Sequence, residues 1–409
     1  MAVSTLTPTA QPQRHELALA DWTGSISRSA LQDLLVVASR PDILSFTLGL
    51  PAPELFPVES FKLAAADVLT REPKALQYCP PHESLKKQIV ELMARRGVEC
   101  RKEQVFLTTG AQQGVNLLAH LLLDKGRQVL AEELVYTGFQ QVLDLFQPEL
   151  LTVPTDLQTG MEVDEVERIL RGGARPAFIY AITDGHNPLG NSISPEKRVR
   201  LVELARRYGV PIIEEDPYGF LCYEEKATPP MRALDGEFVF YVGSLSKVLA
   251  PALRVGWLIV PEVLVSKLSI VKEASDIDTT TFTQRIITSF LETGELPSHL
   301  EKLRREYRLR RDAMLGALET FFPQDARWAK PSSGLFVWVE LPSHLDAEKL
   351  LGVAIETEKV AFIPGSAFSL RRDVRASNCM RLNFSNCSLP HIEEGIERLG
   401  RVIGASLRH

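Results

Sequence analysis

The chain has 409 residues, of which 45% are hydrophobic and 24% charged, and its 46 basic and 52 acidic residues give a formal net charge of −6. This length suits two or three domains, and the composition is that of a globular protein, not of a disordered or fibrous one. Basic residues are neither in excess nor gathered into a long block. A nucleic-acid binder that works by neutralising phosphates is therefore not expected, although a local basic pocket stays open.

No segment of the sequence predicts membrane insertion, secretion or metal binding. The longest apolar runs, 34–38 and 117–123, fall far short of a bilayer span of ~20 residues. The first 16 residues have no basic start followed by an apolar stretch, so they predict a polar tail. The five cysteines form no Cys-x-x-Cys and the eight histidines no His-Glu-x-x-His pattern. We therefore expect no disulfide framework, no metal and a reducing, cytoplasmic location.

From about residue 100 to 262, short β-rich runs alternate with segments of helical period, which is typical of βαβ units and predicts a mostly parallel sheet. Helices are expected at about 111–123 and from about 196. After about residue 295, two helical stretches and further strand-like runs predict a smaller α+β C-terminal domain. The expected strands, in chain order, lie at 105–107, 128–130, 177–182, 210–213, 238–242, 255–260 and 335–340.

Ligands of an open α/β sheet bind outside the carboxyl ends of its strands, so the residues after each strand are the candidates for chemistry. Residues 108–114, Thr-Thr-Gly-Ala-Gln-Gln-Gly, form a small-residue turn that opens a helix and suits a phosphate. Many such turns bind nothing, so this segment alone favours an ordinary turn. In the next segment, Glu-Glu-Asp-Pro-Tyr-Gly (214–219), Asp216 and Tyr218 would point to the same side if the chain is extended. A solvated acidic loop is the simpler alternative there.

The strongest chemical signal is the run at 243–257, Gly-Ser-Leu-Ser-Lys-Val-Leu-Ala-Pro-Ala-Leu-Arg-Val-Gly-Trp. It places Lys247 beside two hydroxyls and seven residues before Arg254, in otherwise apolar surroundings. A lysine removed from water loses proton affinity and becomes an amine nucleophile that can form a Schiff base. Ser244, Ser246 and Arg254 are suitable phosphate ligands.

These segments together resemble the class I/II aminotransferases, which are fold-type I pyridoxal phosphate (PLP) enzymes, and in particular the 2-aminoadipate, kynurenine and aromatic aminotransferase branch. The resemblance runs from about Ile43 to Leu399. It implies an α/β fold with a tail and arm at 1–45, a large PLP-binding domain at 46–295 and a small α+β domain at 296–409. The large domain would hold a mostly parallel sheet of the seven-stranded type flanked by helices. The strings that carry the resemblance are LSFTLGLPAPELFP, TTGAQQG, NPLG, EEDPYGFL, GSLSKVLAPALRVGW, PSSGLFVWVELP, FIPGSAF and MRLNFSN.

The resemblance also implies roles for single residues. Lys247 would form the Schiff base with PLP and move the substrate's α-proton, and Asp216 would pair with the ring nitrogen. Tyr218 and Asn187 would hydrogen-bond the phenolic oxygen, and Arg381 would bind the substrate's α-carboxylate. Further cofactor contacts are implied for Gly110, Ala111, Gln112, Tyr136 on the ring face, Ser244, Ser246, Arg254, and Tyr78 from a second subunit, which predicts a homodimer.

Several positions depart from the family pattern at the substrate side. Thr47-Leu48-Gly49 replaces the usual Ala-Gly-Gly in a turn expected to bind substrate, so Gly49 is a candidate contact. Gln32 falls where relatives that handle dicarboxylates place an arginine, which favours a donor with a neutral or apolar side chain. His186, directly before Asn187, is interpreted first as a packing replacement for glutamine. Its alternative interpretation is an additional acid or base that redirects the chemistry.

An aminotransferase that moves the amino group of an L-amino acid to a 2-oxo acid such as 2-oxoglutarate is the first hypothesis, with no nucleic-acid or membrane partner. A PLP enzyme of the same fold with another reaction, such as a racemase, β-lyase or oxidase, stays open because the substrate side has changed. A ligand-sensing regulator would carry a DNA-binding winged helix before this domain. The resemblance starts at about residue 43 and leaves no room for one, so a regulator is not expected.

Overall fold

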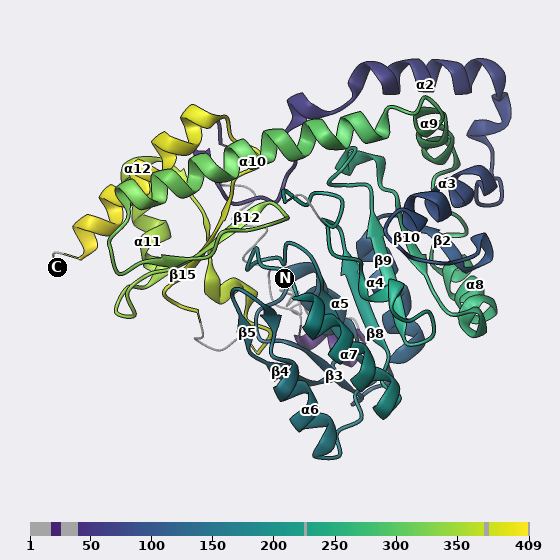
Figure 1. Cartoon of the computed structure of the whole chain (residues 1–409), viewed down its shortest axis with the longest axis horizontal. Coiled ribbons are helices and arrows are strands. Elements are labelled where there is room, and N and C mark those ends of the chain that lie inside the picture. The colour runs from purple at the N-terminus through teal and green to yellow at the C-terminus, as the bar shows by residue number, and fades with distance from the viewer. Residues whose placement is uncertain (1–17, 26–39, 225–226, 372–375, 408–409) are drawn as a thin grey trace, which may run out of the picture.

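The computed structural model describes residues 18–25, 40–224, 227–371 and 376–407, and it contains a large and a small β-sheet connected by one long helix (Figure 1). In the large sheet, the neighbours β3, β4, β7, β8 and β9 run parallel, whereas β10 pairs antiparallel with both β9 and β2. The strands described, in order across this sheet, are β2 (Val105–Thr108), β10 (Gly256–Ile259), β9 (Val239–Ser244), β8 (Ile212–Asp216), β7 (Phe178–Ile182), β3 (Gln128–Glu132) and β4 (Glu149–Val153).

Helices cover both faces of the large sheet, and alternate residues of each strand pack on opposite faces. Tyr180 and Ile182 of β7 pack toward α4 (Ala111–Leu122), α5 (Thr137–Phe146) and α8 (Glu262–Asp276). Ile179 and Ala181 pack toward α6 (Val163–Arg171) and α7 (Pro195–Tyr208). Any side chain of β7 or β8 can therefore be assigned to a face by its position in the strand.

Helix α7 illustrates how local sequence fixes these elements. The side chain of Ser194 accepts a hydrogen bond from the backbone N–H of Lys197, and Pro195 occupies the first helical position. Gly209 ends the helix at φ 66°, a conformation that glycine adopts without steric cost. The chain then enters β8, which carries the acidic segment to the carboxyl edge of the sheet.

The small sheet lies at the other end of the long helix α10 (Leu296–Phe321), where α11 (Ala347–Val353) and α12 (Leu389–Ser406) pack beside it (Figure 1). Its strands are all antiparallel. In order across the sheet they are β11 (Arg327–Trp328), β12 (Phe336–Glu340), β15 (Cys379–Asn383) and β14 (Ile363–Pro364). One hydrophobic core runs from β2 and β10 through α10 into this sheet, so the two sheets share a packed interior.

The other described helices are α2 (Val58–Arg71), α3 (Glu83–Ala94) and α9 (Thr281–Glu292), which pack together beside the β2 edge (Figure 1). Short strand pairs are β1 (Leu44–Ser45) with β13 (Val360–Ala361), and β5 (Thr155–Asp156) with β6 (Gly160–Met161). Single turns of 3₁₀ helix lie at Asp21–Ser25, Pro53–Leu55, Pro73–Leu76, Lys102–Gln104, Met231–Ala233, Pro251–Leu253 and Gly365–Phe368, and a π-helical turn lies at Ala354–Glu358.

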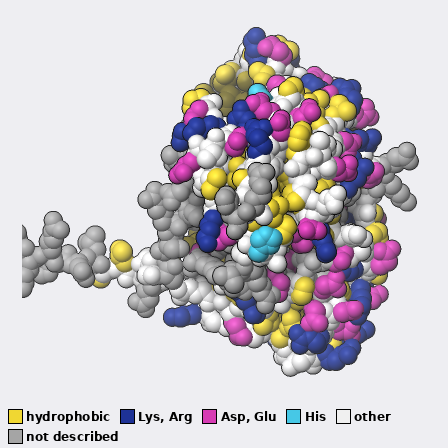
Figure 2. Space-filling model, turned by 90° about the vertical axis from the view of Figure 1, so that its left-hand side faces the viewer, with side chains coloured by type: hydrophobic (Ala, Val, Ile, Leu, Met, Phe, Trp, Pro, Cys, Tyr) yellow, Lys and Arg dark blue, Asp and Glu magenta, His cyan; other side chains and the backbone are white. Residues whose placement is uncertain are grey.

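The predicted fold class is confirmed, with a mostly parallel large sheet and a smaller C-terminal one. Within the described ranges no helix is long and apolar enough to cross a membrane, and no group of three His, Cys, Asp or Glu side chains is placed to hold a metal ion. All five cysteines are described, and none forms a disulfide. Basic and acidic side chains are interspersed over the end of the molecule that carries the small sheet (Figure 2).

Candidate active site

A cavity of about 280 Å³ lies between the carboxyl edge of the large sheet and the small sheet. Its wall is formed by residues 48–50, the start of α4, the ends of β7, β8 and β9 with the loops after them, and one side chain each from β12 and β15. The residues singled out from the sequence that line it are Gly49, Ala111, Gln112, Tyr136, Asn187, Tyr218, Ser244, Ser246, Lys247, Arg254 and Arg381. The segments chosen at the strand ends therefore meet in one place.

Lys247 follows β9 and projects into the cavity with its Nζ 2.7 Å from the carbonyl oxygen of Gly49. Burial, together with the nearby cations of Arg381 and Arg254, lowers the pKa of this lysine from 10.5 to about 8. A large fraction of Lys247 is therefore neutral at a mildly basic pH, so its amine can act as a nucleophile or a base.

One end of the cavity is built to bind an anion. Ala111 and Gln112 form the first turn of α4, whose free N–H groups and dipole favour a negative charge. Ser244, Ser246 and Arg254 lie beside this turn on the cavity wall. Arg254 has a left-handed backbone (φ 51°), an uncommon conformation for a side chain of this size. Its guanidinium bonds the backbone carbonyls of Thr109 and Pro251.

Gly110 allows the Arg254 guanidinium to lie close to the loop before α4, although Gly110 does not line the cavity itself. Its φ is 81°, and a Cβ at this position would clash with the guanidinium of Arg254. The glycine therefore lets the arginine lie against the loop that opens α4.

At the opposite end, Arg381 of β15 is a buried cation that contacts no carboxylate of the described residues. Its Nη1 donates to Asn187 Oδ1 at 2.7 Å, its Nη2 donates to the carbonyl of Thr47, and its Nε is buried without a partner among the described residues. Its guanidinium centre lies 4.2 Å from the ring centroid of Phe336 and 4.9 Å from that of Phe368. Burial lowers its pKa to about 10. A buried arginine that lacks a carboxylate partner among the described residues favours binding of an anion.

Two phenols face the space between these ends. Tyr218 and Tyr136 both line the cavity, and burial raises the pKa of each, so both are neutral hydroxyls at physiological pH. Tyr218 meets Phe336 edge-on, with ring centroids 6.0 Å apart. Tyr136 is the residue directly before α5.

The three successive acids of β8 are buried and do not form a solvated loop. Glu214, Glu215 and Asp216 are 0%, 5% and 1% exposed. Glu214 accepts from the backbone N–H groups of Met231 and Arg232, and burial raises its pKa to about 7. The other two acids, Glu215 and Asp216, lie on opposite sides of the strand and have different partners there.

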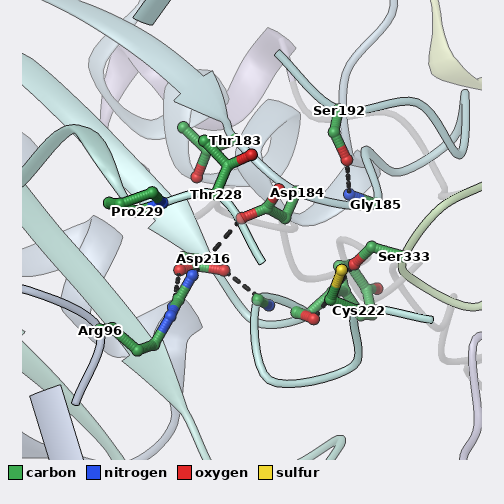
Figure 3. Close-up of polar contacts among 12 residues, drawn as sticks. Arg96, Thr183, Asp184, Gly185, Ser192, Asp216, Cys222, Thr228, Pro229 and Ser333 are labelled. Atoms are coloured by element: carbon green, nitrogen blue, oxygen red, sulfur yellow. Dashed lines mark hydrogen bonds and ion pairs between the residues drawn. The ribbon is translucent and has the colours of Figure 1, made fainter. Parts of the chain in front are cut away.

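Asp216 points away from the cavity, which corrects the expectation that it shares a side with Tyr218. Its carboxylate pairs with Arg96 of the turn after α3 (Figure 3). It also accepts from the hydroxyl of Tyr241 at 3.0 Å and from the backbone N–H of Gly219 at 2.7 Å. The extended segment ends at Asp216, and the chain turns through residues 217–219. The two-residue alternation of a strand therefore does not continue as far as Tyr218.

Glu215 is the carboxylate of β8 that lines the cavity, and the sequence reasoning missed it. It accepts a hydrogen bond from the phenol of Tyr180, and burial raises its pKa. Alternation within the strand could have found it, because Ile213 and Glu215 share the face that packs toward α4 and α5.

Two of the remaining candidates, Tyr78 and His186, are described and do not line the cavity. Tyr78 is 82% exposed, and Gln32 lies outside the described residues. His186 is buried with its Nε2 3.0 Å from Glu132 Oε2, and it is not in the cavity wall. This geometry favours the packing interpretation of His186 over that of an additional acid or base.

Comparison with known proteins places this geometry in a family. The family model described as aminotransferase class I and II matches residues 43–399. An aromatic-amino-acid aminotransferase of Thermococcus litoralis is 36% identical over 389 residues, which cover 93% of this chain and 92% of the relative.

Two solved structures are similar over nearly the whole chain. The kynurenine aminotransferase of Pyrococcus horikoshii, in complex with PMP, has a TM-score of 0.90 at 33% identity and covers 96% of this chain and 98% of its own. The α-aminoadipate aminotransferase of Thermus thermophilus, complexed with N-(5′-phosphopyridoxyl)-L-leucine, has a TM-score of 0.88 at 36% identity, with coverage of 95% and 98%. The chain therefore belongs to the class I and II aminotransferases.

Proposed function

We propose that this aminotransferase uses PLP to move the amino group of an L-amino acid with a neutral or apolar side chain to a 2-oxo acid such as 2-oxoglutarate. The observation that carries the proposal is one cavity with a lysine of lowered pKa in its wall. A helix N-terminus lies at one end, and at the other lies a buried arginine that has no carboxylate partner among the described residues. These are the groups needed to bind PLP and an amino acid together.

The residues present fit PLP. Gly110, Ala111, Gln112, Ser244, Ser246 and Arg254 suit the phosphate, because a Cβ at Gly110 would close the space that the Arg254 guanidinium occupies. Glu215 lines the cavity and Asp216 does not, which supports Glu215 as the acid that would hold a proton on the ring nitrogen. Asn187 and Tyr218 suit the phenolic oxygen, and Tyr136 suits the ring face. When bound, PLP supplies an electron sink for the bond broken at the substrate's Cα.

Lys247 supplies both the covalent attachment point and the base. Its neutral Nζ would provide the amine that holds the cofactor's aldehyde group, and the same amine, once free, would act as the base for the proton on the substrate's Cα. The carbonyl of Gly49 holds Nζ in the cavity by accepting from it at 2.7 Å.

Arg381 fixes the orientation of the amino acid. Its guanidinium lies between two aromatic rings and is held by Asn187 and Thr47, so its position is set before substrate arrives. Binding of the α-carboxylate would bring Cα toward Lys247. Apolar side chains of the wall that could contact the donor's side chain are Leu48, Leu50, Ile182 and Phe336.

The preference for a neutral side chain rests on the charges of this wall. Among the described lining residues the cations are Lys247, Arg254 and Arg381, and each already has a role. No further cation of the described wall is left for a second carboxylate. We further propose a homodimer in which Tyr78, exposed in the single chain, reaches the partner's phosphate site, and a cytoplasmic location.

A substrate panel tests this function. Holoenzyme is mixed with neutral, aromatic and acidic amino acids, with and without 2-oxoglutarate, and the products are identified by mass. The proposal predicts a 2-oxo acid and glutamate only when the acceptor is present, fastest for a neutral or apolar donor. Ammonia release or inverted amino acid without acceptor would overturn transamination, and a panel led by acidic donors would overturn the side-chain preference.

The lowered pKa of Lys247 predicts how fast apoenzyme takes up PLP at different pH values. Only the neutral amine attacks an aldehyde, and the pKa is lowered to about 8, so the reconstitution rate should rise with pH and reach half its plateau near pH 8. Stopped-flow absorbance measures this rate. A rate that keeps rising up to pH 10 would mean that the lysine keeps its ordinary pKa.

Gly110→Ala is expected to weaken PLP binding roughly tenfold or more, because displacing Arg254 removes a charge-assisted hydrogen bond to the phosphate. The backbone conformation itself costs alanine about 1–3 kcal/mol of folding free energy. Gly209→Ala is the matched control, since Gly209 also has a positive φ but open space around its Cα. It should lower the melting temperature and leave the PLP dissociation constant unchanged. Equal PLP binding by Gly110→Ala and wild type would exclude this loop as the phosphate site.

A further inference from the structure

Strand β8 is flanked by two buried tyrosines, one from each neighbouring strand. Tyr180 of β7 is in register with Ile213, and Tyr241 of β9 is in register with Glu214. Each tyrosine donates to the acid two residues beyond its register partner, so Tyr180 donates to Glu215 Oε2 and Tyr241 to Asp216 Oδ2. Because successive residues of β8 point to opposite faces, the two pairs lie on opposite sides of the sheet.

The pair on the cavity side is Tyr180 with Glu215. Glu215 lines the cavity together with Lys247, and Asp216 does not. The Tyr180 ring is held by Phe139 of α5, which stacks on it with centroids 3.6 Å apart and planes 7° from parallel. Both Tyr180 and Phe139 are 1% exposed. The phenol therefore reaches the carboxylate from a fixed ring.

We propose that Tyr180 is a positioning residue, which holds one oxygen of Glu215 so that the carboxylate stays ionised with its other oxygen free for the proton of the cofactor's ring nitrogen. This rests on the proposed function, because it assigns Glu215 to that nitrogen. A glutamate has one more rotatable bond than an aspartate, so a tether matters more for it. A phenol that donates to a carboxylate also favours its charged form.

Charged and titratable groups surround this pair on several elements. Burial and the nearby Asp216 raise the pKa of Glu215. The hydrogen bond from the Tyr180 phenol and the nearby His186 and Lys247 lower it, and the net shift is upward. Burial and Glu215, followed by Tyr136 directly before α5 and Glu132 of β3, raise the pKa of Tyr180 well above 10. Tyr180 is therefore a neutral donor over the working pH range.

The test compares three holoenzymes: wild type, Tyr180→Phe and the matched control Tyr241→Phe. Each tyrosine variant removes one phenol from one buried carboxylate of β8. Three quantities are measured: the pH titration of the bound cofactor's visible absorbance, the PLP dissociation constant, and kcat and KM across pH. The structure predicts that Tyr180→Phe moves the acidic limb of the absorbance and kcat profiles up by about one pH unit, the loss of one hydrogen bond to a charged group.

Tyr180→Phe should also lower kcat more than it raises KM, and it should weaken PLP binding. Tyr241→Phe should leave the limb and PLP binding as in wild type. If the acidic limb of the absorbance and kcat profiles does not move in Tyr180→Phe, the inference is overturned. If this limb moves in Tyr241→Phe instead, the ring nitrogen is assigned to Asp216.

A second variant covers failure of Tyr180→Phe to fold. Glu215→Gln keeps an oxygen that can accept from the Tyr180 phenol but cannot ionise. It should abolish the acidic limb, and persistence of that limb overturns the inference. If wild type itself fails to bind PLP or to transaminate, the proposed function fails. If wild type does both and Tyr180→Phe shows no change, the role of Tyr180 fails. If Glu215→Gln shows no change either, the assignment of Glu215 to the ring nitrogen fails with it.

Discussion

Lys247→Ala is expected to abolish amino transfer, with a loss of at least roughly 10⁴-fold in kcat, since both the nucleophile and the general base disappear. Its Nζ is an amine of lowered pKa within the cavity wall. Single-turnover kinetics on reconstituted protein measure the loss directly.

Lys197→Ala is the control for this loss. Lys197 Nζ also donates to a backbone carbonyl, that of Gly160 at 3.0 Å, but it pairs with Glu162 and does not line the cavity. Its replacement should leave turnover near the wild-type value. Retained amino transfer in Lys247→Ala, after removal of trace wild-type enzyme, would show that another group performs the chemistry.

Arg381→Ala should lower kcat/KM by roughly 30- to 5,000-fold, as expected when one partner of a buried charge pair is lost at a cost of about 2–5 kcal/mol. The loss should be similar for every amino acid in the panel, because the arginine binds the carboxylate that all of them share. The PLP dissociation constant should change little, since Arg381 lies at the end of the cavity away from the start of α4. Steady-state kinetics with several donors measure the effect.

Arg381→Lys separates charge from geometry. Lysine keeps the positive charge but cannot form two parallel hydrogen bonds with a carboxylate, so partial recovery is expected. A loss in Arg381→Ala that depends strongly on the donor's side chain would instead place Arg381 at the side-chain end of the substrate.

Much of the site could be predicted because its residues follow strands of recognisable pattern. Lys247 with its flanking serines follows the β-rich run that became β9, and Arg381 lies among apolar residues of the strand β15. The carboxyl ends of parallel strands meet at one edge, so locating the strands placed these segments together.

Asp216 does not line the cavity, and the reason is local. The strand ends at that residue, and Asp216 accepts from Gly219 N–H as the chain turns, which ends the alternation used to pair it with Tyr218. Its partner Arg96 lies 120 residues earlier in the sequence, and no short-range pattern predicts such a contact.

Tyr180 and β10 were not predictable in the same way. Tyr180 lies in a strand buried along its whole length, where every residue looks like core, and only the register with β8 shows that its hydroxyl meets Glu215. Strand β10 was expected, but its antiparallel insertion between β2 and β9 depends on the path of the intervening chain. Predicting which side chains interact across neighbouring strands therefore requires the sheet topology as well as the sequence.

The most direct test of the account is to reduce the holoenzyme with borohydride, digest it and locate the cofactor by peptide mass mapping. Reduction converts a reversible carbon–nitrogen double bond between a lysine and the cofactor into a stable amine. The predicted result is one pyridoxyl group per chain on the peptide that contains Lys247. No label is expected on the peptide of Lys197 or on that of Lys272, which pairs with Asp276 in α8 outside the cavity wall. Labelling of a different lysine, or no labelling of a protein that transaminates, would contradict it.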